Sequence, residues 1–161
     1  FANGNHERLS VFYWDGTSLG NEQILHIVGA AGIHNGSRLL VLPDNTLLMS
    51  TGDMGDGGVS SQNDNSDNGK ILRFNLDGSV PADNPDPTSY VFTKGHRNSQ
   101  GLCVGPNGVI YSSEHGQYNS DEFNILEAGR NYGWPNVEGA CDGICDWCNA
   151  GAEESLSLIH I

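Results

Sequence analysis

The chain has 161 residues, which is the size of one ordinary domain or of a piece of a larger one. Twenty acidic residues against seven basic ones give a net charge of −13. The chain therefore lacks the clustered Lys and Arg that a nucleic-acid backbone requires, while its carboxylates suit hard cations such as Ca²⁺. No run of about 18 apolar residues exists, so the sequence predicts no membrane-spanning helix.

Short β-rich segments follow one another along the chain, each bounded by Gly, Pro, Asn or Asp. The 22 glycines and the charged fraction of 17% are typical of many short strands joined by turns, and not of a charge-driven disordered chain. No segment keeps a helical period, so helices should be minor and the fold class all-β. The predicted strands are 9–14, 23–28, 38–42, 47–51, 70–76, 90–93, 101–104, 109–113 and 122–126.

An internal repeat is the strongest structural signal in the sequence. Residues 39–48 align with 102–111 at an offset of 63, and residues 8–16 align with 70–78 at an offset of 62. Any two hairpins look alike, but the shared spacing favours a true repeat. The repeated unit holds about four strands, the content of one β-propeller blade. We therefore expect part of a propeller, with two four-stranded units and a long polar loop at 52–69 inserted into the first.

The same offset pairs two side chains of complementary chemistry. His34 and Asn35 align with Arg97 and Asn98 at the 63-residue spacing. Equivalent positions of successive blades surround one axis in a closed propeller. We therefore expect an imidazole base and a guanidinium cation to face the same central cavity.

Three polar or aromatic segments are candidates for chemistry. Residues 95–101 place an imidazole, a guanidinium and two amides in a glycine-bounded turn, which either presents donors to a planar anionic ligand or is an ordinary polar loop. Residues 112–122 end a strand in carboxylates, glycine and amides, which suits Ca²⁺ without matching an EF-hand; a solvated acidic loop is the alternative. Residues 131–135 are an aromatic turn that, taken alone, indicates a packing corner.

The four cysteines divide into one isolated residue and one cluster. Cys103 lies alone in a predicted strand, so we expect a small core residue. Cys141, Cys145 and Cys148 match the local spacing of radical-SAM iron–sulfur cysteines. Their acidic, Gly- and Asp-rich setting favours a disulfide that involves at least one of them over a metal cluster, with free thiols as a third alternative.

Both ends of the sequence bear on its domain organisation. The chain begins at Phe1 without a methionine or a signal peptide, and residues 156–161 resemble a translated sequencing-library adapter, with a short apolar strand end as the alternative. We expect residues 1–155 to be a partial propeller of two to three blades and residues 156–161 to be a non-native tail. Such a piece cannot close a ring, so the isolated chain is expected to be inactive.

Several motifs, taken in order, resemble the soluble pyrroloquinoline quinone (PQQ) dependent glucose/sorbosone dehydrogenase family. The resemblance covers about residues 8–142. It implies a six-bladed β-propeller that oxidises aldose sugars with Ca²⁺-bound PQQ and passes the electrons to an external acceptor. It also implies that the protein is periplasmic or secreted. The pieces that carry it are 34–39, 52–53, 69–78, 81–85, 95–101, 114–116, 121–124 and 131–135.

The resemblance also implies roles for individual residues. His34 would be the general base that takes the proton of the anomeric hydroxyl, and Arg97 would stabilise negative charge on the quinone. The residues that would contact PQQ are Asn98, Gln100, His115 and Asp121. Those that would bind metal are Gly116 and Gln117 (the cofactor's Ca²⁺, by their carbonyls) and Glu122, Tyr132 (by its carbonyl) and Asp142 (a second, structural Ca²⁺).

The sequence departs from the family pattern at two places. Ile33 precedes the predicted base where well-known members carry an acidic residue, and His115-Gly116-Gln117 stands where they carry Gln-Gly-Pro. The basic residues of later blades that grip PQQ in the family are not in this sequence. The alternative is a non-catalytic, calcium-stabilised propeller that binds a partner, of the hedgehog-interacting type. A pure binding module has no need of both His34 and Arg97.

Overall fold

The computed structural model describes residues 2–3, 5–139 and 157–160. The regular secondary structure of this part of the chain is almost wholly β-strand, with one short helix, α1 (Val59–Gln62). All nine strands predicted from the sequence are present, which confirms the all-β fold class. The strands are β1 (Ala2–Asn3), β2 (His6–Trp14), β3 (Leu19–Gly29), β4 (Gly36–Val41), β5 (Thr46–Thr51), β6 (Lys70–Asn75), β7 (Val91–Lys94), β8 (Ser99–Val104), β9 (Ile110–Glu114), β10 (Glu122–Leu126) and β11 (Ser157–His160).

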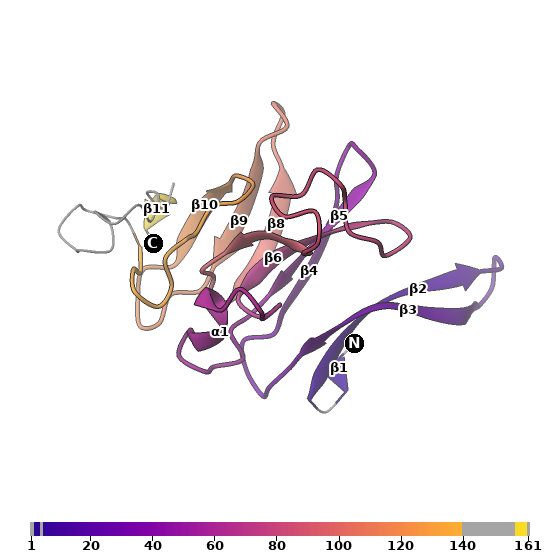
Figure 1. Ribbon diagram of the computed structural model, residues 1–161, viewed down its shortest axis with the longest axis horizontal. Helices are drawn as coiled ribbons and strands as arrows, with labels where there is room; N and C mark the ends of the chain where they lie inside the picture. Colours follow the sequence, from indigo (N-terminus) through magenta and orange to yellow (C-terminus); the bar gives the residue numbers. More distant parts are fainter. Residues whose placement is uncertain (1, 4, 140–156, 161) are drawn as a thin grey trace.

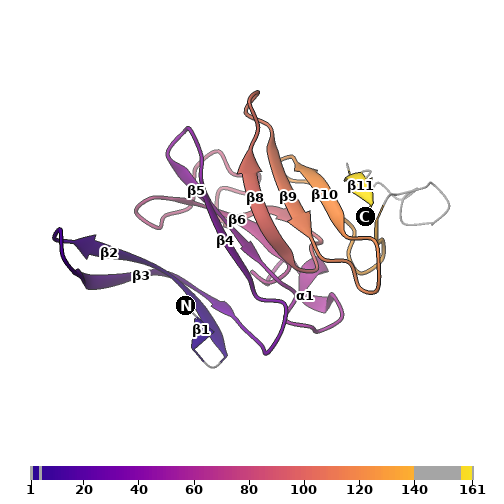
Figure 2. The same ribbon diagram turned by 180° about the vertical axis from the view of Figure 1, so that it is seen from behind.

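The strands pair in antiparallel fashion into three sheets within the described residues. Their strand orders are β1-β2-β3, β4-β5-β6-β7 and β8-β9-β10-β11. Figures 1 and 2 show the two four-stranded sheets side by side, with the β2–β3 hairpin as an arm on the opposite side of the β4–β7 sheet. Each sheet is a meander, because neighbours in a sheet are neighbours in the sequence, as in the blades of a propeller.

The central strands of the β4–β7 sheet, β5 and β6, are buried on both faces. Side chains alternate between the two faces of a strand, so neighbouring residues of β5 enter different cores. One core joins this sheet to the β2–β3 hairpin through Leu9, Val28, Leu47, Met49, Leu72 and Phe74. The other joins it to the β8–β10 strands through Leu42, Leu48, Ile71, Phe92, Leu126 and Tyr132. Successive sheets that stack through their apolar faces are the arrangement of propeller blades.

The predicted repeat is reproduced at the level of single hydrogen bonds. In the turn between β4 and β5, the N–H of Asn45 donates to the carbonyl of Leu42 at 3.0 Å. The bond recurs 63 residues later, from Gly108 to Gly105, also at 3.0 Å. Asn45 and Gly108 have φ of +63° and +76°, the left-handed conformation that Asn and Gly tolerate. The two hairpins are therefore equivalent, as the first two strands of successive sheets.

The second aligned pair of segments is equivalent as well. β2 and β6 are each the penultimate strand of their sheet, followed by an antiparallel partner. The repeat boundary thus falls before β4 and before β8, and the β2–β3 hairpin precedes the first four-stranded sheet. Both offsets seen in the sequence follow from this single arrangement.

The long loop between β5 and β6 is fixed from within by a buried ammonium group. Lys70 is 0% exposed, and its Nζ donates to the carbonyls of Ser60 at 2.7 Å, Ser61 at 3.1 Å and Asn68 at 2.9 Å. An ammonium group has three donors, so these contacts satisfy it completely. The loop is therefore held in one shape at the end of the sheet where it leaves β5.

One core residue predicted from the sequence is placed wrongly. Cys103 is a free, exposed cysteine of β8. Its neighbours Leu102 and Val104 pack against the core between the two four-stranded sheets, so strand alternation turns Cys103 to the other face. The predicted cysteine cluster, 141–148, lies outside the described residues.

Within the predicted non-native tail, Ser157–His160 forms β11 and pairs with β10. The origin of these residues stays a prediction. Of the helical segments described, none has the length and apolar character needed to cross a membrane.

Candidate functional site

The predicted base, His34, lies in the loop before β4, against the residues that follow β5. Its φ of +54° is in the left-handed region, and its carbonyl accepts a 3.2 Å hydrogen bond from the N–H of Met54. A Cβ at Gly52 would collide with this carbonyl, so only glycine fits there. The imidazole Nδ1 lies 2.7 Å from Oδ1 of Asp53. Because an ionised carboxylate only accepts hydrogen bonds, Nδ1 carries the proton and Nε2 can accept one.

Asp53 is enclosed by donors. Its side chain is 1% exposed. Oδ1 also accepts the N–H of Gly55 at 2.8 Å, and Oδ2 accepts the indole N–H of Trp134 at 2.9 Å. A buried carboxylate with this many donors is a rigid orienting group for an imidazole. No role was predicted for Asp53 or Trp134 individually; the available signal was that 52–53 and 131–135 are among the segments that carry the family resemblance.

The predicted cation, Arg97, meets the same aspartate from the segment that precedes β8. Its carbonyl accepts the N–H of Asp53 at 2.8 Å, and its guanidinium carbon lies 5.4 Å from the ring centroid of Trp134. Nη1 donates to the carbonyl of His115 at 3.2 Å, while Nε is buried and has no hydrogen-bond partner among the described residues. His34 and Arg97 are therefore joined through Asp53 and Trp134.

Three of the four residues predicted to contact the cofactor line one cavity of about 170 Å³: Gln100, His115 and Asp121. The side chains of His115 and Asp121 are 60% and 53% exposed, with Nδ1 and Oδ1 3.7 Å apart. Asn98, the fourth, is buried, and its Oδ1 accepts a 3.1 Å hydrogen bond from Nε2 of Gln100. An amide, an imidazole and a carboxylate around one cavity fit a polar ligand.

The residues predicted to bind metal meet at a second, much smaller cavity. Its volume is about 10 Å³, which is room for a single atom the size of a water oxygen. The lining includes the predicted Gly116, Glu122 and Tyr132, together with Arg97, Glu114 and Glu138. Gln117 lies next to it, because its N–H donates to the Glu138 carboxylate. Asp142 is outside the described residues.

Buried negative charge is the electrostatic feature of this cavity. Burial, and then the neighbouring Glu114 carboxylate, raise the pKa of Glu122 to about 7. The oxygens of Glu122 accept hydrogen bonds from Asn124 Nδ2 at 2.9 Å and from the N–H of Gly139 at 2.6 Å. Oδ1 of Asn124 is buried without a hydrogen-bond partner in the described part of the chain. Crowded carboxylates beside an unpaired amide oxygen fit a hard divalent cation.

A metal here would depend on backbone oxygens as well. Across residues 2–3, 5–139 and 157–160, no group of three or more His, Cys, Asp or Glu side chains is arranged to hold a metal ion. Calcium accepts carbonyl oxygens as readily as carboxylates. The predicted use of the Gly116, Gln117 and Tyr132 carbonyls is consistent with that requirement, and the residues present fit Ca²⁺.

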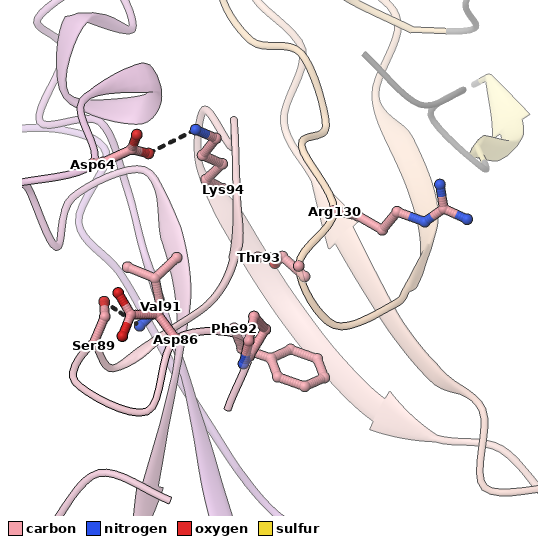
Figure 3. Close-up of a pocket in the computed structure, with 10 residues that line it drawn as sticks. Asp64, Asp86, Ser89, Val91, Phe92, Thr93, Lys94 and Arg130 are labelled. Atoms are coloured by element: carbon pink, nitrogen blue, oxygen red, sulfur yellow. Dashed lines mark hydrogen bonds and ion pairs between the residues drawn. The ribbon is translucent and has the colours of Figure 1, made fainter. Parts of the chain in front are cut away.

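A third cavity, larger than these two, lies elsewhere, beside β7. It has a volume of about 340 Å³, and its lining includes Val91, Phe92, Lys94 and Arg130. Figure 3 shows Lys94 turned toward Asp64, with which its Nζ makes a 2.6 Å ion pair, and Arg130 pointing away from both. None of the residues predicted to be catalytic, cofactor-binding or metal-binding lines this cavity. Size alone therefore does not identify the functional site.

Comparison with known proteins gives one family and several relatives. The family described as Glucose / Sorbosone dehydrogenase matches residues 4–146. The chain is 43% identical over 151 residues to an uncharacterized protein of Synechocystis, which covers 83% of this chain and 37% of that protein. It is 39% identical over 130 residues to the quinoprotein glucose dehydrogenase B of Acinetobacter calcoaceticus, with 68% of this chain and 27% of that protein covered.

Solved structures agree with the sequence comparison. The structure of the PQQ-bound aldose sugar dehydrogenase from Streptomyces coelicolor matches with a TM-score of 0.82 and 38% identity, over 86% of this chain and 43% of that one. Together with the stacked four-stranded sheets, this match confirms the predicted part of a β-propeller. The chain spans less than half the length of each of these relatives.

Proposed function

This chain belongs to the glucose/sorbosone dehydrogenase family, and we propose that in the full-length protein it supplies the base and the cation of a PQQ-dependent aldose sugar dehydrogenase. The reaction is oxidation of the anomeric hydroxyl. The observation that supports this most directly is the 2.7 Å contact between Nδ1 of His34 and the buried carboxylate of Asp53, at the site that also holds Arg97.

The base step follows from this contact. Asp53 holds the proton of His34 on Nδ1, so the lone pair of Nε2 can take the proton of a hydroxyl group. No described residue hydrogen-bonds to Nε2. The imidazolium that forms is stabilised by the carboxylate, which Gly55 and Trp134 hold in place. His34 is thus a base whose tautomer and orientation are set before a sugar arrives.

Arg97 adds a fixed positive charge next to the base. Its backbone is tied to Asp53, and its guanidinium rests on Trp134, so the side chain loses little freedom when a ligand binds. A guanidinium in that position attracts anionic oxygens and stabilises negative charge that develops on an acceptor.

The cofactor and the metal complete the proposal. PQQ would be held by Asn98, Gln100, His115 and Asp121, its Ca²⁺ by Gly116 and Gln117, and a second Ca²⁺ by Glu122, Tyr132 and Asp142. When bound, PQQ supplies the electron sink for the hydride of the anomeric carbon and Ca²⁺ supplies Lewis-acid polarisation. The setting we propose is the periplasm or the extracellular space, with an external electron acceptor.

Reconstitution of the full-length protein tests the function. The apoprotein is titrated with PQQ in excess Ca²⁺ and again in excess chelator, and binding is followed by the absorption of the cofactor. We expect saturable binding that requires Ca²⁺, followed by aldose-dependent reduction of a dye acceptor. A full-length protein that never binds PQQ in excess Ca²⁺ would instead support the non-catalytic binding module.

A further inference from the structure

Each of the two four-stranded sheets carries a histidine–carboxylate contact at the same end of the sheet, although the two pairs are not repeat equivalents, because the 63-residue offset aligns His34 with Arg97. Before β4, His34 Nδ1 lies 2.7 Å from Asp53, which follows β5; before β8, His96 Nδ1 lies 2.8 Å from Glu114, the last residue of β9. The sequence separations are 53 − 34 = 19 and 114 − 96 = 18 residues. In each blade a histidine in the entry loop thus pairs with a carboxylate at the end of the second strand.

The second pair is sealed off from any substrate. The side chains of His96 and Glu114 are 0% and 5% exposed. The other ring nitrogen of His96, Nε2, lies 2.8 Å from Oγ1 of Thr93, and the ring stacks on Tyr132 with centroids 4.7 Å apart. Both ring nitrogens of His96 are engaged, so it cannot serve as a base for the sugar. A buried ionisable pair is costly to desolvate, so its presence is weak evidence that it stabilises the fold.

What the pair holds is the backbone of the predicted cation. Oε1 of Glu114 accepts the N–H of Arg97 and, at 3.2 Å, the N–H of Asn98. Its other oxygen accepts the proton of His96 Nδ1, so one carboxylate fixes three consecutive residues. The carbonyl of His96 accepts the hydroxyl of Ser61 at 2.6 Å, which ties the same turn to the 52–69 loop.

We propose that Glu114, oriented by His96, is a positioning residue that fixes the backbone of Arg97 and Asn98 and thereby sets the Arg97 guanidinium over Trp134, ready for an anionic ligand. The consequence for cofactor binding rests on the proposed function; the backbone contact does not. The histidine–carboxylate unit thus has two uses in adjacent blades: one orients a base, the other orients a cation.

The test variant is Glu114→Gln in the full-length protein, because it keeps the shape of the side chain. The glutamine amide group donates where a carboxylate oxygen accepted, so His96 must change its tautomer or lose this hydrogen bond, and the two backbone N–H groups keep only a neutral acceptor in place of a charged one. PQQ affinity should fall by roughly 10- to 100-fold, the range for losing a hydrogen bond to a charged acceptor, and kcat at saturating PQQ should fall with it. The matched control is Glu7→Gln, because Glu7 is also buried (2% exposed), accepts a 2.7 Å hydrogen bond from Ser37 Oγ and lies on a different element, β2. PQQ affinity and kcat should not change in this control variant.

A double-mutant cycle separates positioning from general stability. If Glu114 acts mainly through Arg97, Glu114→Gln introduced into an Arg97→Ala protein should change PQQ affinity by less than about threefold, because the guanidinium that it positions is gone and only the weaker 3.2 Å contact to the Asn98 N–H remains to be altered. A merely structural role would give the same loss in both backgrounds. Two outcomes would overturn the proposal. In the first, Glu114→Gln has the same PQQ affinity and kcat as the Glu7→Gln control. In the second, Glu114→Gln lowers PQQ affinity in the Arg97→Ala background as much as it does in the wild type.

A readout without cofactor keeps the inference apart from the proposed function. In apoprotein labelled with ¹⁵N-arginine, the Arg97 amide proton should resonate downfield, because its acceptor is a carboxylate, and should move upfield in Glu114→Gln. An unmoved Arg97 signal overturns the positioning role even if PQQ binds. A moved signal in a protein that never binds PQQ upholds the positioning role and rejects the proposed function. If Glu114→Gln does not fold, His96→Asn is measured in the same ways, with the same outcomes deciding.

Discussion

The indole N–H of Trp134 donates a 2.9 Å hydrogen bond to Oδ2 of Asp53, a residue 81 positions earlier in the chain. This contact ties the aromatic turn at 131–135 to the end of β5. The same indole ring lies under the Arg97 guanidinium, while Asp53 holds the imidazole of His34. Trp134 therefore contacts both groups: its N–H holds the Asp53 carboxylate that orients the base, and its ring face packs against the guanidinium of Arg97.

Trp134→Phe separates these two contributions, because phenylalanine keeps an aromatic face and lacks the N–H. Asp53 should then lose one of its donors and hold His34 less rigidly, so kcat should fall by about 10-fold, while PQQ affinity changes little. Steady-state kinetics and a PQQ titration of the full-length protein measure both quantities. Trp14→Phe is the matched control, since Trp14 is 57% exposed on the β2–β3 hairpin. Equal kcat in the two variants would show that the indole N–H is not needed.

His34→Gln should remove the base and leave PQQ affinity close to that of the wild type. The loss should fall on kcat, by about 10²- to 10⁴-fold, which is the usual contribution of a positioned general base. Asp53→Asn should act in the same direction, because an asparagine amide does not hold the proton on Nδ1 of His34. Turnover with near-normal kcat after His34→Gln would reject this residue as the base.

Arg97→Ala should weaken PQQ binding as well as turnover, because it removes a charge and a forked donor together. A loss of roughly 10- to 100-fold in PQQ affinity is the range for a hydrogen bond to a charged group. Arg97→Lys keeps the charge without the planar fork, so its affinity should lie between that of the wild type and that of Arg97→Ala. Affinity that is equal in all three proteins would show that Arg97 does not contact the cofactor.

The sequence predicted the strands because their signals are local. The turns at Asn45 and Gly108 require a left-handed backbone conformation, which Asn and Gly tolerate, and the two residues occupy the same position in their hairpins. Cys103 could also have been placed correctly, since Leu102 and Val104 on either side of it are apolar and strand alternation turns the residue between them outward. The error came from treating an isolated cysteine by its type and not by its position in the strand.

The contacts of the site could be predicted only in part. The repeat offset and the family resemblance singled out His34 and Arg97, and in the structure each of them makes a hydrogen bond to Asp53. Their roles stay predictions. Asp53 and Trp134 were missed because their contact depends on how two sheets stack, which no local pattern encodes. The His96–Glu114 pair was missed for the same reason, and the repeat offset did not point to it, because that offset aligns His34 with Arg97 and not with His96.

Calcium should stabilise the protein in a pH-dependent way through Glu122. Burial and the Glu114 carboxylate raise the pKa of Glu122 from 4.5 to about 7, so between these pH values the folded state binds more protons than the unfolded chain. In chelator, the free energy of unfolding should therefore fall as the pH rises through that window. Ca²⁺ binds the ionised carboxylate, so it should raise Tm more at pH 8 than at pH 5 (about one unit above and two below that pKa).

Thermal unfolding with CaCl₂ or chelator at the two pH values measures this effect, and Glu122→Gln is the variant that isolates it. The glutamine cannot ionise, so the difference in Tm between low and high pH should shrink in chelator, and part of the calcium effect at high pH should disappear. A calcium effect on Tm that is identical in Glu122→Gln and in the wild type would show that this carboxylate is not a calcium ligand.

Lys70→Met should destabilise the full-length protein through the 52–69 loop. The variant leaves the carbonyls of Ser60, Ser61 and Asn68 without their buried donor, at a cost of roughly 3 kcal/mol or more in the free energy of unfolding. Lys94→Met is the matched control, because Lys94 pairs with Asp64, whose side chain is 76% exposed, and such a surface pair contributes less than about 1 kcal/mol.

Burial also lowers the pKa of Lys70 from 10.5 to about 8, so in that window the unfolded chain binds more protons than the folded one. The free energy of unfolding of the wild type relative to Lys70→Met should therefore increase as the pH rises through the window, which denaturant titrations at both ends can measure. A loss no larger than that of Lys94→Met would show that the ammonium group does not hold the loop.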